Sequence, residues 1–245
     1  MVRVREGLAA AVVALVAVLA VSVQIGLDVL PSLVGLACGC ALCVVVTRGA
    51  ASMGAAALGP ADLVTLARAT LACALTALAV DPSLGGMAAA AVVPLAVLAL
   101  LLDAVDGRIA RLTGTTSAFG TRFDGEADAF LLLVLSIYVA PAYGWWVLAI
   151  GMARYVFGLA GWAWTWMRAQ LPFRYWRKVV TAVQGIALVI AASNVLPRAA
   201  AYAALFGALA LLTESFGRDV LWLWRRRPAA VDSMQSTPGG RLQVP

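Results

Sequence analysis

The stretch that decides the fold runs from Asp103 to Asp128, reads DAVDGRIARLTGTTSAFGTRFDGEAD, and contains four aspartates. Strongly apolar runs flank it on both sides, at 88–102 and 129–140. Charged residues beside apolar sequence of bilayer length are energetically expensive, so they usually mark a functional site. The stretch therefore predicts a polar site between two membrane-spanning helices.

The spacing of the aspartates predicts the geometry of that site. Asp103 and Asp106 are three residues apart, and Asp124 and Asp128 are four apart, so each pair shares one helix face. Two such helices packed together would direct four carboxylates into one cavity. Because four close carboxylates need compensating cations and oxygen ligands favour hard divalent ions, we expect Mg²⁺ or Mn²⁺ here.

A purely structural role, as ion pairs that only hold helices together, is the alternative interpretation. The four aspartates and Glu126 outnumber the neighbouring cations Arg108, Arg111 and Arg122. Helix packing alone does not need this acidic excess, so we favour a functional site.

The composition indicates an integral membrane protein. The chain of 245 residues is 63% hydrophobic and 12% charged, whereas soluble domains are about half apolar and a quarter charged. The net charge of +6 does not indicate nucleic-acid binding, because the basic residues lie at the edges of apolar runs. The four cysteines lie inside apolar runs and the chain has no histidine, so we expect neither a zinc site nor disulfides.

The apolar runs predict an all-α polytopic bundle of eight spans, at about 8–25, 33–46, 69–80, 87–102, 120–140, 145–164, 178–194 and 200–212. The first two form a transmembrane hairpin (1–48). The other six form a core domain (49–227), and 228–245 is predicted to be a disordered tail.

The distribution of basic residues predicts the orientation. With the N-terminus inside, only Arg198 falls in an outer loop and Arg154 within a span, while the other basic residues lie inside. This asymmetry follows the positive-inside rule. We therefore expect a protein of the cell membrane whose termini, tail and aspartates face the cytoplasm.

The aspartate stretch also resembles the signature of the CDP-alcohol phosphotransferase family, D-x-x-D-G-x-x-A-R, eight residues, G-x-x-x-D-x-x-x-D. Both the gap of eight and every fixed position match, at Asp103, Asp106, Gly107, Ala110, Arg111, Gly120, Asp124 and Asp128. The resemblance implies a six-helix core, to which the 1–48 hairpin is an addition, and a homodimer.

The resemblance also implies an activity. Members transfer a phosphatidyl group from a CDP-linked lipid, usually CDP-diacylglycerol, to an alcohol and release CMP. It implies that the four aspartates hold the metal ions and that Asp128 is the general base on the acceptor hydroxyl. The residues implied to contact CDP are Thr65, Arg68, Asp106, Gly107, Ala110, Arg111 and Gly120.

Thr65 and Arg68 come from a second, less complete resemblance, to an N-terminal family motif of the form P-N-x-x-T-x-x-R. Here Pro60 lies one residue further from Thr65 than in that motif, and Asp62 replaces the usual asparagine. We place this segment on an interfacial helix before the span at 69–80. Without the resemblance, it would be an interfacial amphipathic turn.

The acceptor is less constrained. Lys178, Thr181 and Gln184 form a K-x-x-T-x-x-Q pattern that resembles members making phosphatidylglycerol phosphate, which favours glycerol 3-phosphate. The basic residues predicted to bind the acceptor phosphate are Arg154, Arg174, Arg177 and Lys178. Alternatives are inositol phosphate or another polyol as acceptor, a purely anchoring role for these cations, or a transporter that uses the aspartates as an ion path.

Overall fold

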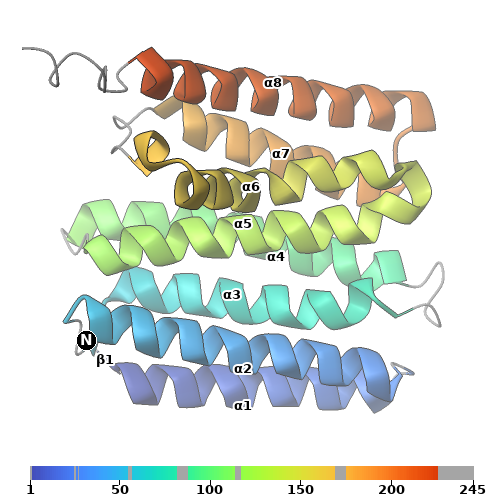
Figure 1. Cartoon of the computed structure of the whole chain (residues 1–245). Helices are drawn as coiled ribbons and strands as arrows, with labels where there is room; N and C mark the ends of the chain where they lie inside the picture. Colours follow the sequence, from blue (N-terminus) through green and yellow to red (C-terminus); the bar gives the residue numbers. More distant parts are fainter. Residues whose placement is uncertain are drawn as a thin grey trace, which may run out of the picture.

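The structure is a computed structural model that describes residues 2–24, 26, 28–54, 57–81, 88–113, 117–168 and 175–225. Within these ranges it contains eight α-helices that run side by side as one bundle (Figure 1). They are α1 Val4–Gln24, α2 Val29–Ser52, α3 Pro60–Ala79, α4 Ala88–Thr113, α5 Ala118–Tyr143, α6 Leu148–Ala163, α7 Tyr175–Ser193 and α8 Arg198–Arg225. The predicted all-α membrane bundle is confirmed.

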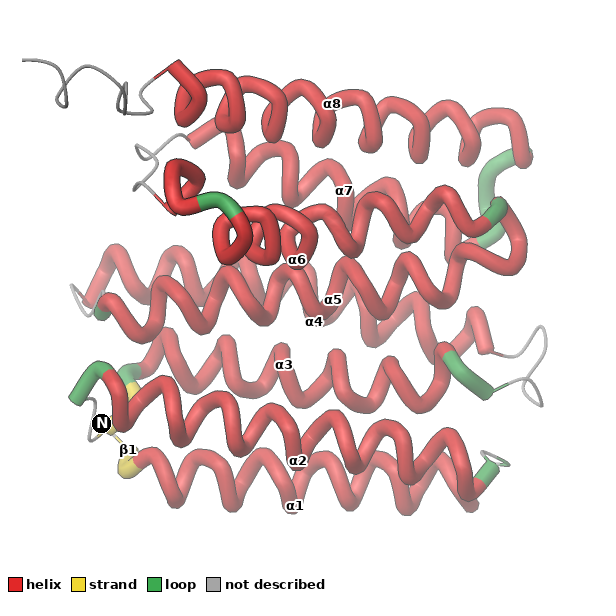
Figure 2. Tube along the Cα trace, viewed as in Figure 1, coloured by secondary structure: helices red, strands yellow, loops and turns green. Residues whose placement is uncertain are grey.

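Short segments complete the described chain (Figure 2). An antiparallel ladder pairs β1, Val2–Arg3, with β2, Ala57–Leu58, and so ties the start of the chain to the residues before α3. Turns of 3₁₀ helix at Trp145–Val147 and Thr165–Arg168 flank α6. The predicted tail at 228–245 lies outside the described residues.

Seven helices among the described residues, α2 to α8, are long and apolar enough to cross a membrane. The α1 helix, which is the first predicted span, is 21 residues long, and several of its side chains lie outside the described set. The α2 helix continues to Ser52, past the predicted end of the hairpin at 48. In Figure 1, α1 and α2 lie against α3 at one side of the bundle, and α6 to α8 lie at the other.

The α3 helix corrects one prediction, because the expected interfacial helix and the span at 69–80 are a single helix from Pro60. Pro60 is well placed at the first helical position, where its missing N–H costs nothing. Asp62 Oδ2 accepts a hydrogen bond from the Gly59 N–H at 2.8 Å and caps the helix start. No glycine or further proline interrupts 61–79, so the helix continues straight into the membrane segment.

The α5 helix corrects a second prediction, because it passes through Pro141, beyond the predicted end of this span at about 140. Membrane helices tolerate proline because neighbouring groups satisfy the freed carbonyl. The helix ends two residues later, where Gly144 adopts a φ of 106° that side chains rarely allow. At its other end, the Ser117 hydroxyl accepts a hydrogen bond from the Gly120 N–H at 2.8 Å.

Two apolar clusters fix the helices that carry the aspartates. The larger one joins α3, α4, α5, α7 and α8 through residues such as Leu75, Leu135 and Leu188. The smaller one joins α1 and α2 to α3 and α5, and includes Leu66 of α3 and Phe123 of α5. Because Leu66 and Phe123 are close neighbours of Arg68 and Asp124 in the chain, this second cluster helps to place both charged side chains.

Candidate functional site

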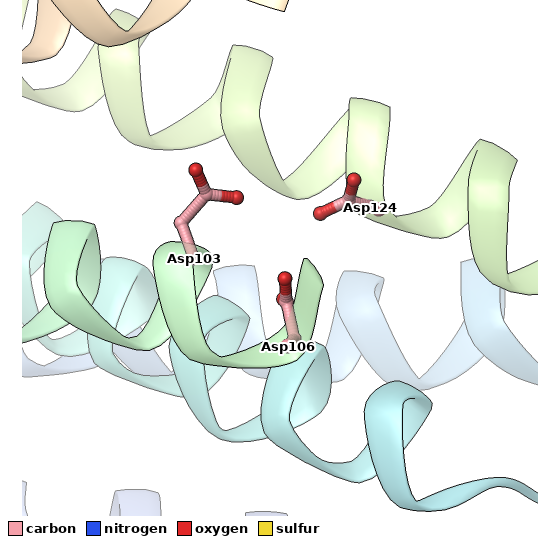
Figure 3. Close-up of side chains that lie close together, drawn as sticks. All are labelled: Asp103, Asp106 and Asp124. Atoms are coloured by element: carbon pink, nitrogen blue, oxygen red, sulfur yellow. The ribbon is translucent and has the colours of Figure 1, made fainter. Parts of the chain in front are cut away.

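Three of the four signature aspartates meet where α4 and α5 face each other (Figure 3). Carboxylate oxygens of Asp103 and Asp106, on α4, and of Asp124, on α5, all lie within 4.8 Å of one another. Asp106 is buried, and the other two are partly exposed. The prediction that two helices direct their aspartates into one site is confirmed for these three residues.

The centre of this aspartate cluster is the guanidinium of Arg68, which reaches in from α3 and is fully buried. Its Nη2 lies 2.5 Å from Asp124 Oδ1 and 3.7 Å from Asp106 Oδ2. Its Nη1 lies 3.1 Å from Asp128 Oδ1 and also contacts Asp103. One side chain therefore links all four carboxylates, including Asp128, which lies outside the group of three.

A second polar contact comes from the same face of α3. The Thr65 hydroxyl lies 3.1 Å from Asp106 Oδ2 and 3.1 Å from the Ala61 carbonyl, so its single proton is shared between these two acceptors. Thr65 and Arg68 are three residues apart, so both side chains reach α4 from one helix face. We predicted that they contact CDP; within the protein they contact the aspartates.

Gly120 of the signature has a steric reason to be glycine. A Cβ at this position would overlap Asp62 Oδ1 and lie 3.0 Å from Ser117 Oγ. The first turns of α3 and α5 therefore approach closely through Asp62, the residue that replaces the asparagine of the family motif. Its cap on α3 and its contact with α5 went unpredicted, although an acidic residue two positions after Pro60 is a signal for a helix cap.

On its other side, Asp128 lines a small pocket of about 100 Å³ between α5, α6, α7 and α8. Thr181 and Gln184 of α7 and Arg154 of α6 also line it. Gln184 is only 3% exposed, and its Nε2 has no hydrogen-bond partner within the described structure. A buried amide without a partner is costly, so this pocket presents a donor group suited to a polar ligand.

Arg154 makes an ion pair of 2.9 Å with Glu126 at the edge of this pocket, where both side chains are about half exposed. A Cβ at Gly125 would lie 3.0 Å from the Arg154 guanidinium, so the glycine makes room for it. Glu126 was predicted only as part of the acidic excess, and the sequence did not identify Arg154 as its partner, although an arginine within a span is expected to face a cavity or a carboxylate.

The other predicted acceptor cations are placed elsewhere. Arg177 pairs with the buried Asp219 of α8 at 3.7 Å, and Lys178 is exposed. Neither is among the described residues that line the pocket. Arg174 lies outside the described residues, as do the side chains of Ala110 and Arg111. Gly107 is partly buried on α4 directly after Asp106.

A larger groove of about 330 Å³ lies beside the aspartate cluster, between α2, α3, α5 and α6. Its walls are mostly apolar and include Ala41 and Leu42 of α2 and Phe130 of α5. Ala69 and Ala127 also line it, and each is the chain neighbour of a cluster residue, Arg68 and Asp128 respectively. An apolar groove therefore lies next to the charged site.

A family model described as CDP-alcohol phosphatidyltransferase matches residues 58–213, which include α3 to α7 and most of α8. The chain belongs to the CDP-alcohol phosphatidyltransferase family. The four signature aspartates that Arg68 links lie within the matched range. The matched range excludes both helices of the N-terminal hairpin, α1 and α2.

Two curated relatives bear the name CDP-diacylglycerol–serine O-phosphatidyltransferase. The protein of Helicobacter pylori strain 26695 is 45% identical over 69 residues, which is 28% of this chain and 25% of that protein. The protein of strain J99 is 41% identical over 69 residues, which is 26% of this chain and 29% of that protein. The alignments thus span about a quarter of these relatives' length. No solved structure matches the chain.

Proposed function

We propose that this CDP-alcohol phosphatidyltransferase transfers the phosphatidyl group of CDP-diacylglycerol to a small alcohol and releases CMP. The observation that carries the proposal is that Asp128 belongs to both halves of the site. It contacts Arg68 in the aspartate cluster and lines the small polar pocket next to it. A residue in this position can act on an acceptor hydroxyl while the donor lies on the other side.

The aspartate cluster fits divalent metal ions of the hard class. Its ligands are carboxylate oxygens, three of them within 4.8 Å of one another, and such ligands favour Mg²⁺ or Mn²⁺. Asp103, Asp106 and Asp124 would hold the metal, with Asp128 at the edge of the site. When bound, such a metal supplies positive charge that offsets the charge of the donor's diphosphate.

The protein's own residues then have separate roles. Asp128 would accept the proton of the acceptor hydroxyl as general base, which makes the oxygen a better nucleophile. Thr65 orients Asp106 through its hydrogen bond. Gly107 leaves room for the nucleotide to approach the backbone of α4.

The apolar groove beside the cluster supports a lipid donor. It is lined mostly by apolar side chains of α2, α3, α5 and α6, and two of its lining residues, Ala69 and Ala127, directly follow Arg68 and precede Asp128 in the chain, respectively. An acyl chain in this groove would leave its head group at the aspartates. Since the family match begins at residue 58, α2 would contribute a wall from outside the family domain.

For the acceptor we propose serine. Arg154, which lines the pocket, and Glu126, with which it pairs, offer one positive and one negative group, which complement the carboxylate and ammonium of an amino acid. The names of the two relatives agree with this choice. Glycerol 3-phosphate is the second candidate, because Thr181 and Gln184 of the K-x-x-T-x-x-Q pattern do line the pocket.

The distribution of basic residues supports an active site on the cytoplasmic side of the cell membrane. The aspartates at the end of α4 lie near Arg108, on the side that carries most of the positive charge.

The test is CMP release by purified protein in CDP-diacylglycerol vesicles with Mg²⁺ or Mn²⁺. Serine, glycerol 3-phosphate, inositol phosphate and inositol are supplied one at a time. Asp128→Asn is the inactive variant, and Asp28→Asn, the same change at an exposed residue before α2 whose side chain makes no cap hydrogen bond, is the matched control. We expect metal-dependent release with serine that only Asp128→Asn abolishes. CMP release with glycerol 3-phosphate but not with serine would reverse the choice of acceptor. Cation flux across the vesicle membrane without CMP release would support the alternative that the protein is a transporter.

A further inference from the structure

We propose that Arg68 is a positioning residue that competes with the divalent metal for the aspartate oxygens and so sets the metal affinity of the site. This inference rests on the proposed metal-dependent function. It concerns a residue that we expected to touch the nucleotide and that contacts the carboxylates instead.

The contacts of Arg68 are the first step. Both terminal nitrogens are engaged, Nη2 with Asp124 at 2.5 Å and Nη1 with Asp128 at 3.1 Å. Each nitrogen also has a partner on α4, Asp106 for Nη2 and Asp103 for Nη1. The planar fork of an arginine thus bridges two helices, which a compact ammonium group cannot do in the same way.

These contacts occupy the oxygens that a metal would use. Asp103, Asp106 and Asp124 supply the three closely spaced oxygens, and each of these residues pairs with Arg68. A metal and a guanidinium are both cations, and within a few ångströms in a buried site they repel each other strongly. They therefore cannot both make their best contacts with the same carboxylates.

The charge balance shows why the site still attracts a metal. Four carboxylates carry four negative charges, and the single positive charge of Arg68 leaves an excess of three. A divalent ion offsets this excess better than an arginine does, so it can displace the guanidinium from some of the oxygens.

Arg68 is also held in a way that permits displacement. Its Nε is buried without a hydrogen-bond partner, so only the two terminal nitrogens fix the side chain. Burial of an N–H without an acceptor is unfavourable, and a small rotation of the Arg68 side chain can bring this N–H to an acceptor. A released guanidinium would be free to pair with a phosphate of the donor, because its fork matches phosphate oxygens as well as carboxylates.

The test is the binding of Mn²⁺ to detergent-solubilised full-length protein, measured by electron paramagnetic resonance of free Mn²⁺. Arg68→Gln removes the charge and keeps much of the side-chain volume. We expect it to bind Mn²⁺ at least about tenfold more tightly than the wild type, because the competing cation is gone. The matched control is Arg218→Gln, which removes an exposed arginine of α8 paired with Glu214 and should leave Mn²⁺ affinity unchanged.

A second measurement separates competition from simple damage to the fold. Without Mn²⁺, Arg68→Gln should unfold at a lower temperature than the wild type, since four carboxylates then repel without compensation. Saturating Mn²⁺ should raise its unfolding temperature more than that of the wild type. Should Arg68→Gln fail to fold, Arg68→Met serves instead, because it also removes the competing charge, and it too should bind Mn²⁺ more tightly than the wild type.

The outcomes distinguish this inference from the proposed function. Equal or weaker Mn²⁺ binding by the Arg68 variants, with binding by the wild type, would overturn the competition and leave the metal site intact. Absence of Mn²⁺ binding in the wild type and in every Arg68 variant would overturn both the competition and the metal-dependent function.

Discussion

The two sides of Asp128 use charge in different ways. On the side of α3 and α4, Arg68 is fully buried and pairs with four carboxylates. On the side of α6, Arg154 and Glu126 form one pair whose side chains are 47% and 51% exposed. Removing one partner of a buried pair costs about 3–5 kcal/mol, whereas an exposed pair contributes about 0–1 kcal/mol.

If the proposed function holds, this difference determines how the two substrates are selected. The proposed donor side combines buried, mutually dependent charges with an apolar groove. Few substitutions there should therefore preserve donor binding. The acceptor side relies on the shape of a small pocket, on hydrogen bonds and on exposed charges, so its specificity can change with few substitutions. The following predictions test this contrast, from the largest expected effect to the smallest.

The largest effect is expected for Asp128→Asn, which removes the carboxylate shared by both sides. The amide cannot accept the acceptor's proton, so the rate of CMP release should fall by about 10²–10⁴-fold. Steady-state release with saturating donor and serine measures this rate. A decrease below tenfold would contradict the assignment of Asp128 as general base, and Asp28→Asn controls for loss of a carboxylate at an exposed position.

The next effect is expected for Gly120→Ala, which places a methyl group against Asp62 where α3 meets α5. Overpacking of this kind costs about 1–3 kcal/mol, and we expect a lower unfolding temperature together with weaker donor binding. Gly217→Ala on α8 is the matched control, because a Cβ there meets nothing within 4 Å. That control should be neutral or slightly stabilising; equal behaviour of the two variants would contradict the close contact.

The apolar groove can be tested with Ala41→Trp, which fills it from α2. The KM for dioleoyl CDP-diacylglycerol should rise roughly three- to tenfold, while the KM for a dibutyryl donor should not change, because only the long chain needs the groove. Val44→Trp, at an exposed α2 position outside the groove lining, is the control. An equal increase for both donors would exclude the groove as the acyl-chain site.

A smaller effect, confined to the acceptor, is expected for Gln184→Leu. Loss of one hydrogen bond of about 0.5–1.5 kcal/mol corresponds to a rise of roughly two- to tenfold in the KM for the acceptor. The KM for the donor should not change. If instead the donor KM rises and the acceptor KM stays constant, the pocket does not hold the acceptor.

The smallest effect is expected for Lys178→Gln. Lys178 is exposed and does not line the pocket, so the KM for serine should change less than about twofold, as for a surface charge. This variant also sharpens the choice of acceptor. If the wild type is active on glycerol 3-phosphate and Lys178→Gln raises the KM for that substrate tenfold or more, Lys178 binds the acceptor.

Much of this architecture follows from the sequence because it depends on local patterns. The positions of α4 to α8 follow from apolar runs, and the pairing of Asp103 with Asp106 and of Asp124 with Asp128 follows from helical spacing. The interruption expected at Pro141 was wrong because tertiary neighbours can satisfy a freed carbonyl, which a local rule does not include. The acceptor cations were predicted from their charge and, for Lys178, from the K-x-x-T-x-x-Q resemblance, and neither determines which pocket a side chain lines; of them, Arg154 lines the pocket.

The sequence by itself determined that this is a membrane bundle whose signature aspartates share two helix faces, since both properties depend on residue type and spacing along one chain. Only the tertiary structure decided that Arg68 of α3 lies between those faces, that Asp128 borders the pocket with Gln184, and that α2 walls the groove. Each of these contacts joins residues of different helices. Their distances depend on how close-packed side chains set the separation and rotation of neighbouring helices, and no single helix carries that information.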